Sequence, residues 1–247
     1  GLGDVYKRQS LFRSLIYILQ HKYINEFIGK FFKTNTQKKG LLKCIFTTLL
    51  FQLVVTSLTF IIIYRSEFIK KRQNIPNLLN SLLFLFFAIA LIFMMSSYNL
   101  SFMHRSLLFI LFSILQGLFL GYNLKYLRGN TILSALVFTG VLFLLMLLVG
   151  FIMVYFNVDL SWLGVILFFL LLFLIIVRIM NYFIPYSKSS DLYLRIFALL
   201  LFSVYIVYDT NIILLRYDAI KYDRDCILGA LDYYLDIINI FVNSLHR

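Results

Sequence analysis

The chain has 247 residues, of which 62% are hydrophobic and 14% are charged, whereas soluble domains are roughly 45–50% apolar and about 25% charged. This composition excludes a sizeable soluble domain and indicates an integral membrane protein embedded in the lipid bilayer. The net charge of +12 could indicate a nucleic-acid partner. Nine of the 23 Lys and Arg residues, however, lie within residues 7–43, where a basic block orients a membrane helix and contacts anionic lipid. We therefore expect no nucleic-acid binding.

The start of the chain differs in character from the remainder. Residues 1–9, "GLGDVYKRQ", resemble translated sequencing-adapter sequence, and we expect them to be a non-native leader. Residues 10–40 form a basic N-terminal segment, and within it residues 10–33 place apolar side chains at roughly helical spacing between basic ones. This pattern is typical of an amphipathic helix on the membrane surface, and a poorly ordered basic leader is the alternative.

Seven apolar segments follow, each near the roughly 20 residues that a helix needs to cross the hydrocarbon core. They are Leu41–Tyr64, Leu78–Tyr98, Ser106–Tyr122, Thr131–Tyr155, Leu160–Ile184, Leu192–Leu215 and Cys226–Leu245. Because lipid offers no hydrogen-bond partners to the backbone, each segment should be an α-helix. The sequence therefore predicts an all-α, multi-pass membrane domain over residues 41–247.

The distribution of Lys and Arg indicates how this domain is oriented. With a cytosolic N-terminus, thirteen of these residues lie on the cytosolic side and nine on the other side, which favours that orientation. The seventh segment is the weakest predicted span, and a re-entrant hairpin there is the alternative.

The cysteines and histidines give no indication of a cofactor or metal site. Cys44 and Cys226 are the only cysteines, and each stands at the start of a predicted span, a setting that suggests neither a disulfide framework nor a zinc site. The three histidines lie outside the spans. We therefore expect no resident metal and no cofactor.

Three carboxylates inside the predicted spans need an explanation, because a charge at mid-membrane costs at least ~2.5–3.5 kcal/mol. Asp209 lies six residues from the inner end of the sixth span, and Asp232 and Asp236 lie six and ten residues into the seventh. At about 1.5 Å per residue, these positions are roughly 9, 9 and 15 Å deep. Consecutive helices with a short connection pack side by side, so we expect the three acids to lie together.

Carboxylates crowded in a medium of low dielectric constant cannot all be ionised, so this group should share a proton and respond to pH. It is also a place where a permeating cation can pause. In the alternative interpretation, each Asp only holds helices together by hydrogen bonds to Thr210, Asn211, Asn239 or a tyrosine.

Two other features of the spans have structural interpretations. Arg178 lies about six residues from the end of the fifth span, near enough to extend its guanidinium to the interface. Gly117 and Gly121 form a GxxxG pattern in the third span, which indicates close helix packing.

The acidic segments also carry a family likeness. "FSVYIVYDT" at 202–210 and "LGALDYYLDIINIF" at 228–241 resemble the paired signatures of the transmembrane Bax-inhibitor-motif (lifeguard) family. Further matches are "FQLVVTSLTF", "FSILQGLFLG" and "DLSWLGVILFFLLLFLII", so the resemblance runs from about residue 41 to the end.

The resemblance implies a seven-transmembrane helix bundle with the last helix central. It also implies a pH-sensitive calcium leak, with Ca²⁺ and protons as the ions involved, and suppression of cell death in eukaryotes. The proton-sensing pair of the family corresponds to Asp209 and Asp236, with Tyr208 and Thr210 completing the first signature. The expected location is an intracellular membrane (ER or Golgi) in a eukaryote and the plasma membrane in a bacterium.

The chain departs from the family pattern in three ways. Asn211 stands where the family usually has Gln, Asp232 is an additional acid, and the second span has no internal Arg to pair with the acids. Gating through such a salt bridge is therefore not expected here.

Two other functions compete with a leak channel. Intramembrane aspartyl proteases carry "YD" and "GxGD" on successive helices, but the only "GLGD" here is at residues 1–4, outside any span. We therefore expect no enzymatic activity. A non-conducting membrane scaffold that regulates membrane-protein partners is the main alternative function.

Overall fold

The structure is a computed structural model that describes residues 36–66, 77–97, 100–124, 126–183, 187–215 and 222–245. The expected leader at 1–9 and the amphipathic segment at 10–33 lie outside the described residues. The first described helix begins at Thr36, inside the range assigned to the basic N-terminal segment.

The described residues form seven α-helices and no strand. Six of these helices are long and apolar enough to cross a membrane, and the apolar part of α4 that is described, Leu83–Ser96, is shorter. The predicted all-α, multi-pass architecture is therefore confirmed. The helices are α2 (Thr36–Arg65), α4 (Asn77–Ser96), α5 (Phe102–Leu124), α6 (Gly129–Tyr155), α7 (Leu163–Phe183), α8 (Lys188–Leu215) and α9 (Tyr222–Ser244).

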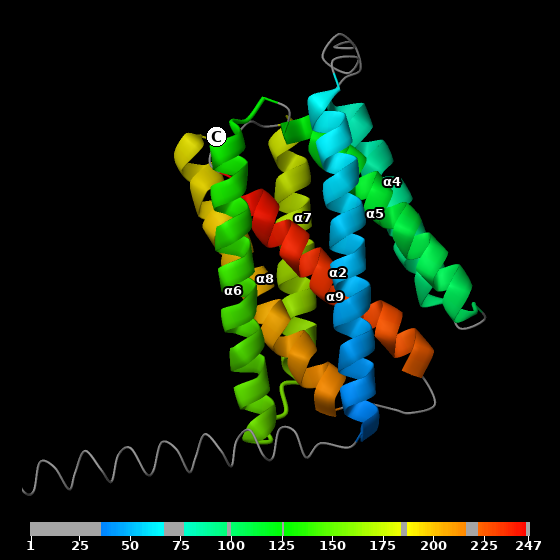
Figure 1. Cartoon of the computed structure of the whole chain (residues 1–247). Helices are drawn as coiled ribbons and strands as arrows, with labels where there is room; N and C mark the ends of the chain where they lie inside the picture. Colours follow the sequence, from blue (N-terminus) through cyan, green and yellow to red (C-terminus); the bar gives the residue numbers. More distant parts are fainter. Residues whose placement is uncertain are drawn as a thin grey trace, which may run out of the picture.

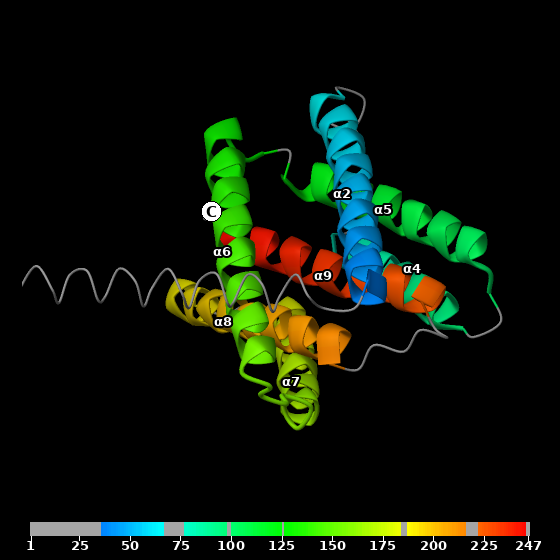
Figure 2. The same cartoon turned by 60° about the horizontal axis from the view of Figure 1, so that its bottom comes forward.

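The last helix is the centre of the bundle. In Figures 1 and 2, α9 passes between one group formed by α2, α4 and α5 and a second formed by α6, α7 and α8. It contacts α2, α4, α5, α6 and α8. In its most apolar stretch 56% of the residues are buried, against 11% in α7, so α9 forms the core and α7 faces outward. The expected central position of the last helix is confirmed.

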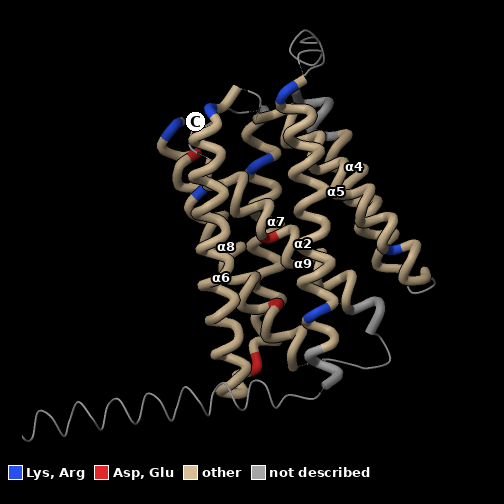
Figure 3. Tube along the Cα trace, viewed as in Figure 1, with Lys and Arg blue, Asp and Glu red and all other residues tan. Residues whose placement is uncertain are grey.

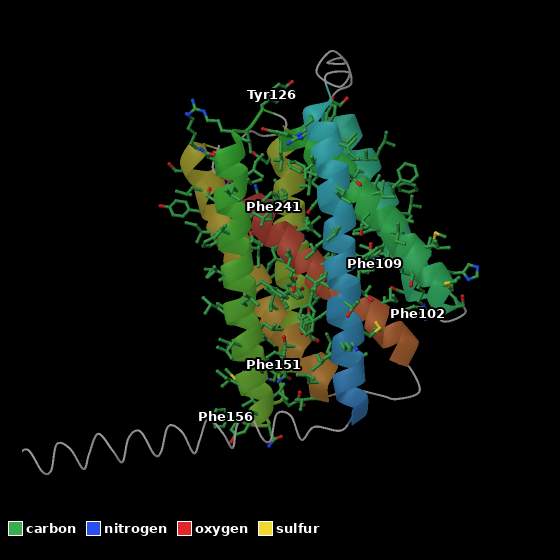
Figure 4. The ribbon with its side chains drawn as sticks, viewed as in Figure 1. Phe102, Phe109, Tyr126, Phe151, Phe156 and Phe241 are labelled. Atoms are coloured by element: carbon green, nitrogen blue, oxygen red, sulfur yellow. A yellow bond between two sulfur atoms is a disulfide. The ribbon has the colours of Figure 1, made fainter. Side chains whose placement is uncertain are left out.

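Successive helices run in opposite directions across the bundle. Figure 4 shows Tyr126, between α5 and α6, at the upper end and Phe156, at the end of α6, at the lower end. The helix α9 is continuous from Tyr222 to Ser244, so the re-entrant alternative is wrong. The start of α9 lies toward the end of the bundle where α2 begins (Figure 1); that this end faces the cytosol stays a prediction.

The GxxxG pattern lies on the face of α5 that packs against α2. A Cβ atom added at Gly117 would lie 2.7 Å from the Thr56 carbonyl oxygen and from Thr59 Cβ, and one at Gly121 would lie 2.7 Å from Ile63 Cβ. These separations are too short for a larger residue, so the two glycines allow α2 and α5 to approach closely.

One expectation about the cysteines is wrong. Cys44 in α2 and Cys226 in α9 form a disulfide with a Cα–Cα distance of 5.8 Å across a sequence separation of 182 residues. The number of cysteines carries no information on whether two helix starts meet in space. The central position of α9, which brings its first turns against α2, is what places the two thiols together.

A candidate carboxyl cluster between two helices

The candidate site consists of Asp209 on α8 and Asp232 and Asp236 on α9. The side chains of Asp209 and Asp236 lie within hydrogen-bonding reach of each other, and Asp232 lies within electrostatic reach of both. The structure thus brings together the three acids that the sequence predicts to be neighbours. Figure 3 shows acidic positions inside the bundle as well as nearer its ends.

The three carboxyl groups differ in exposure. Asp236 is buried, with 4% of its surface exposed, Asp209 is half-buried and Asp232 is exposed. The Oδ2 atom of Asp236 is buried without a hydrogen-bond partner. The cluster therefore extends from the surface of the bundle at Asp232 to its interior at Asp236.

The pairing of Asp209 with Asp236 has a chemical consequence. An ionised carboxylate only accepts hydrogen bonds, so two carboxyl groups can bond to each other only when one of them carries a proton. Both ion pairs found among the described residues involve a different acid, Asp191. Within the described part of the chain, neither of these ion pairs neutralises Asp209 or Asp236.

Tyr233 is a member of the site that the sequence reasoning did not single out. Its hydroxyl lies 2.8 Å from Thr210 Oγ1, and its side chain is fully buried within electrostatic reach of all three acids. Thr210 already donates to the Ile206 carbonyl oxygen at 2.7 Å, so Tyr233 is the donor. Tyr233 and Asp236 are three residues apart on one helix, and this spacing could have indicated that Tyr233 belongs to the site.

Asn211 positions the turn between α6 and α7. Its Nδ2 donates to the Val158 carbonyl oxygen at 2.7 Å, and its Oδ1 accepts from the Leu160 backbone N–H at 3.1 Å. The turn itself begins at Asn157, which has a positive φ of 54°, a conformation that Asn tolerates better than most residues. Asn211 is fully buried, so the amide fixes this turn against α8, two residues after Asp209.

The remaining predicted supporting residues bond or pack away from the acids. Asn239 donates to the Leu235 carbonyl oxygen at 2.8 Å. The Tyr208 hydroxyl packs against the backbone of Gly164 in α7, where an added Cβ would overlap it. In the described part of the chain, the amides and the threonine proposed as helix glue thus have other partners, and Asp209 bonds to Asp236.

A second polar group lies on the opposite side of α9. The Tyr234 hydroxyl is 2.6 Å from Thr56 Oγ1 in α2, and Ser113 Oγ in α5 donates to Gln52 Oε1 at 2.7 Å. The ring of Tyr234 also contacts Phe109 (Figure 4) with a centroid distance of 5.4 Å. Adjacent tyrosines therefore fasten α9 to the two helix groups on either side of it.

The C-terminal end of α9 is held by charged groups at the other end of the bundle. Arg178 forms an ion pair with Asp191 at 3.1 Å and donates to Asn243 Oδ1 at 2.8 Å. Arg195 bonds to the same Asp191 at 2.7 Å and donates to the Leu245 carbonyl oxygen at 2.6 Å. The predicted interfacial position of Arg178 thus coincides with a role in fastening α9 to α7 and α8.

Comparison with known proteins identifies relatives over most of this fold. Residues 38–246 match the family described as "Inhibitor of apoptosis-promoting Bax1". The chain is 30% identical over 135 residues to Protein LIFEGUARD 4 of Arabidopsis thaliana, an alignment that covers 55% of this chain and 53% of that protein. It is 33% identical over 135 residues to Bax inhibitor 1 of Schizosaccharomyces pombe, with coverage of 55% and 48%. The chain therefore spans about half the length of the curated relatives it matches.

Proposed function

The chain belongs to the family of inhibitors of apoptosis-promoting Bax1, and we propose that it acts as a pH-sensitive calcium leak channel of the Bax-inhibitor type. The observation that carries the proposal is that the carboxyl groups of Asp209 on α8 and Asp236 on the central helix α9 lie within hydrogen-bonding reach of each other inside the bundle. A hydrogen bond between two carboxyl groups needs a proton, and here it would join α9 to α8.

The mechanism follows from the two protonation states of this pair. With one proton the two carboxyl groups attract each other, and without it two negative charges repel each other in a medium of low dielectric constant. Proton binding therefore changes the force between α8 and α9. The unprotonated pair also presents oxygen ligands of the kind that Ca²⁺ prefers.

Asp232 supplies the approach to this pair. Its carboxyl group is exposed and lies one helical turn before Asp236 on α9, so a cation or proton arriving from the end of the bundle where α9 begins meets it first. A like charge at this position also acts on the pair. Asp232 is therefore proposed to tune the pH response, and Asp236 to define it.

The names of the relatives support a role in restraining cell death. One of them is called Bax inhibitor 1 and occurs in a yeast, and we extend such a role to this chain in a eukaryotic host. The membrane would then be that of the ER or Golgi, and in a bacterial host the plasma membrane. Regulation of other membrane proteins without conduction is the competing function.

The test is calcium flux through the purified chain in liposomes over about pH 5 to 8. Wild type should conduct with a pH-dependent rate, and Asp236→Asn should make the rate independent of pH because it keeps the shape but removes the titratable group. Asp232→Asn is the matched control, and it should shift the midpoint while keeping the response. Absence of flux at every pH would instead favour the non-conducting scaffold. If Asp236→Asn keeps the wild-type profile and Asp232→Asn abolishes it, the assignment of the two acids is reversed.

A further inference from the structure

The disulfide between Cys44 and Cys226 lies where the central helix begins. These residues are the only cysteines of the chain, so no other thiol can compete for either partner. Cys226 is fully buried and Cys44 is half-buried. An attacking thiol therefore reaches the bond through the Cys44 sulfur atom.

The position of the bond in the membrane makes this attack feasible. The apolar parts of α2 and α9 begin at Gly40 and Cys226, so Cys44 lies four residues, or about 6 Å, inside the apolar boundary. Thr48 Oγ1 is 3.8 Å from Cys226 Sγ and provides a polar partner for that sulfur when the bond opens. The pair therefore lies close to one face of the membrane, the side from which a small thiol would approach it.

The bond also controls how α9 is held. One turn after Cys226, a Cβ at Gly229 would lie 2.9 Å from Ile45 Cδ1 of α2, so the two helices are in close contact here. Asp232 follows Cys226 by six residues on α9. A covalent link at Cys226 thus restrains the half of α9 that carries the exposed end of the carboxyl cluster.

We propose that Cys44 and Cys226 form a thiol–disulfide exchange site whose reaction partner is a small thiol of the glutathione class, and whose state sets the freedom of the first half of α9. In reduction, a thiolate attacks the Cys44 sulfur, forms a mixed disulfide and releases the Cys226 thiolate, which takes up a proton. A second thiol then attacks the mixed disulfide and frees Cys44. Two thiols are oxidised to one disulfide, and the protein gains two electrons and two protons.

The reaction runs in both directions under cellular conditions. In the orientation predicted from the distribution of Lys and Arg, this end of the bundle faces the cytosol, where glutathione keeps most thiols reduced. Oxidised glutathione reverses each step, forms the protein disulfide and leaves two reduced thiols. The disulfide therefore forms when the surrounding thiol pool becomes oxidised and opens when the pool is reduced again.

The first experiment counts free thiols in the full chain in liposomes. The protein is equilibrated with mixtures of reduced and oxidised glutathione, quenched with acid and labelled with a maleimide-polyethylene glycol that shifts its position on a gel. Wild type should take two labels in the reduced mixture and none in the oxidised one, whereas Cys44→Ser should retain one labelled thiol after unfolding in reductant. Two labels in every mixture would overturn the exchange site.

The second experiment tests the restraint on α9 without relying on flux. Oxidised wild type should unfold at a higher temperature than reduced wild type, and the variant with both cysteines replaced by Ser should show no such difference. Equal unfolding temperatures for the two forms of wild type would overturn the restraint.

The effect on the pH midpoint of calcium flux rests on the proposed function and is measured last. Oxidised and reduced wild type should differ in midpoint, and the Ser variant should not respond to glutathione. Absence of flux in every state refutes the proposed channel, while thiol counts and unfolding temperatures still decide the exchange site. Flux with an identical midpoint in both redox states would overturn the coupling to the carboxyl cluster.

Discussion

Tyr233 and Tyr234 form a natural pair of test positions, because they are adjacent on α9 and both fully buried but face different surroundings. Tyr233 bonds to Thr210 beside the carboxyl cluster. Tyr234 bonds to Thr56 on the other side of the helix. Replacing either by Phe keeps the ring and removes one hydroxyl group.

The expected loss of stability is small and similar for the two variants. Thr210 keeps its bond to the Ile206 carbonyl oxygen, and Thr56 keeps its bond to the Gln52 carbonyl oxygen at 2.9 Å, so neither threonine is left with an unsatisfied hydrogen. The cost is then the net value of one hydrogen bond in a membrane protein, about 0.6–1.7 kcal/mol. For a chain of this length this corresponds to a decrease of about 1–7 °C in Tm, measured by thermal unfolding in detergent micelles.

The two variants should differ in how the carboxyl cluster titrates. Of these two hydroxyl groups, that of Tyr233 lies within electrostatic reach of the acids and that of Tyr234 does not, so of the two variants only Tyr233→Phe should change the relative stability of their protonation states. A change of about 0.6 kcal/mol corresponds to a shift of about 0.4 pH unit in the midpoint. Infrared titration of the protonated carboxyl band measures this midpoint directly, without requiring flux. An equal shift in Tyr234→Phe would refute the reasoning, because the effect would then be a general loosening of α9.

Two further predictions concern packing and the turn between α6 and α7. Gly121→Ala should lower the free energy of unfolding by about 1–3 kcal/mol, because the added Cβ would lie 2.7 Å from Ile63 Cβ. Gly140→Ala is the control: its Cβ would have no atom within 4 Å, so Tm should stay unchanged or rise slightly. Equal effects of the two substitutions would contradict close packing of α2 and α5. Asn211→Ala removes both hydrogen bonds to the turn. It should therefore lower the fluorescence anisotropy of Trp162, the single tryptophan of the chain. An unchanged anisotropy would count against a role of Asn211 in fixing the turn.

The sequence predicts the helices and the placement of the acids well, because both depend on distances along single helices. A span is set by the thickness of the hydrocarbon core, and the predicted range 131–155 differs from α6 (Gly129–Tyr155) by only two residues at its start. The depths of Asp209 and Asp236 follow from residue counts and the helical rise. Packing of α8 against α9 then brings the two side chains near each other.

Hydrogen-bond partners could not be predicted in the same way, because they depend on which surfaces meet after folding. The alternative interpretation made Asn211 a hydrogen-bond partner of an acid, whereas its amide fixes a turn some 50 residues earlier in the chain. Arg105 lies just before the predicted third span Ser106–Tyr122, yet it is buried at the start of α5 and donates to the Ser97 carbonyl oxygen at 2.8 Å. The disulfide belongs to the same class, since it depends on a contact between helices at opposite ends of the sequence.

The restraints on α9 differ in whether cellular conditions can change them. Near its end, Arg195 holds the Leu245 carbonyl oxygen, and a guanidinium remains charged at any physiological pH. Toward its start, the Cys226 disulfide can be reduced, and in its middle the bond from Asp236 to Asp209 depends on a proton. The restraints that cellular conditions can change therefore lie at and before the middle of the helix, whereas the hydrogen bond from the charged Arg195 side chain lies at its end. A movement of α9 driven by protons or by thiols would accordingly pivot about its C-terminal end and displace its first half, which is the half that joins α2 to the carboxyl cluster.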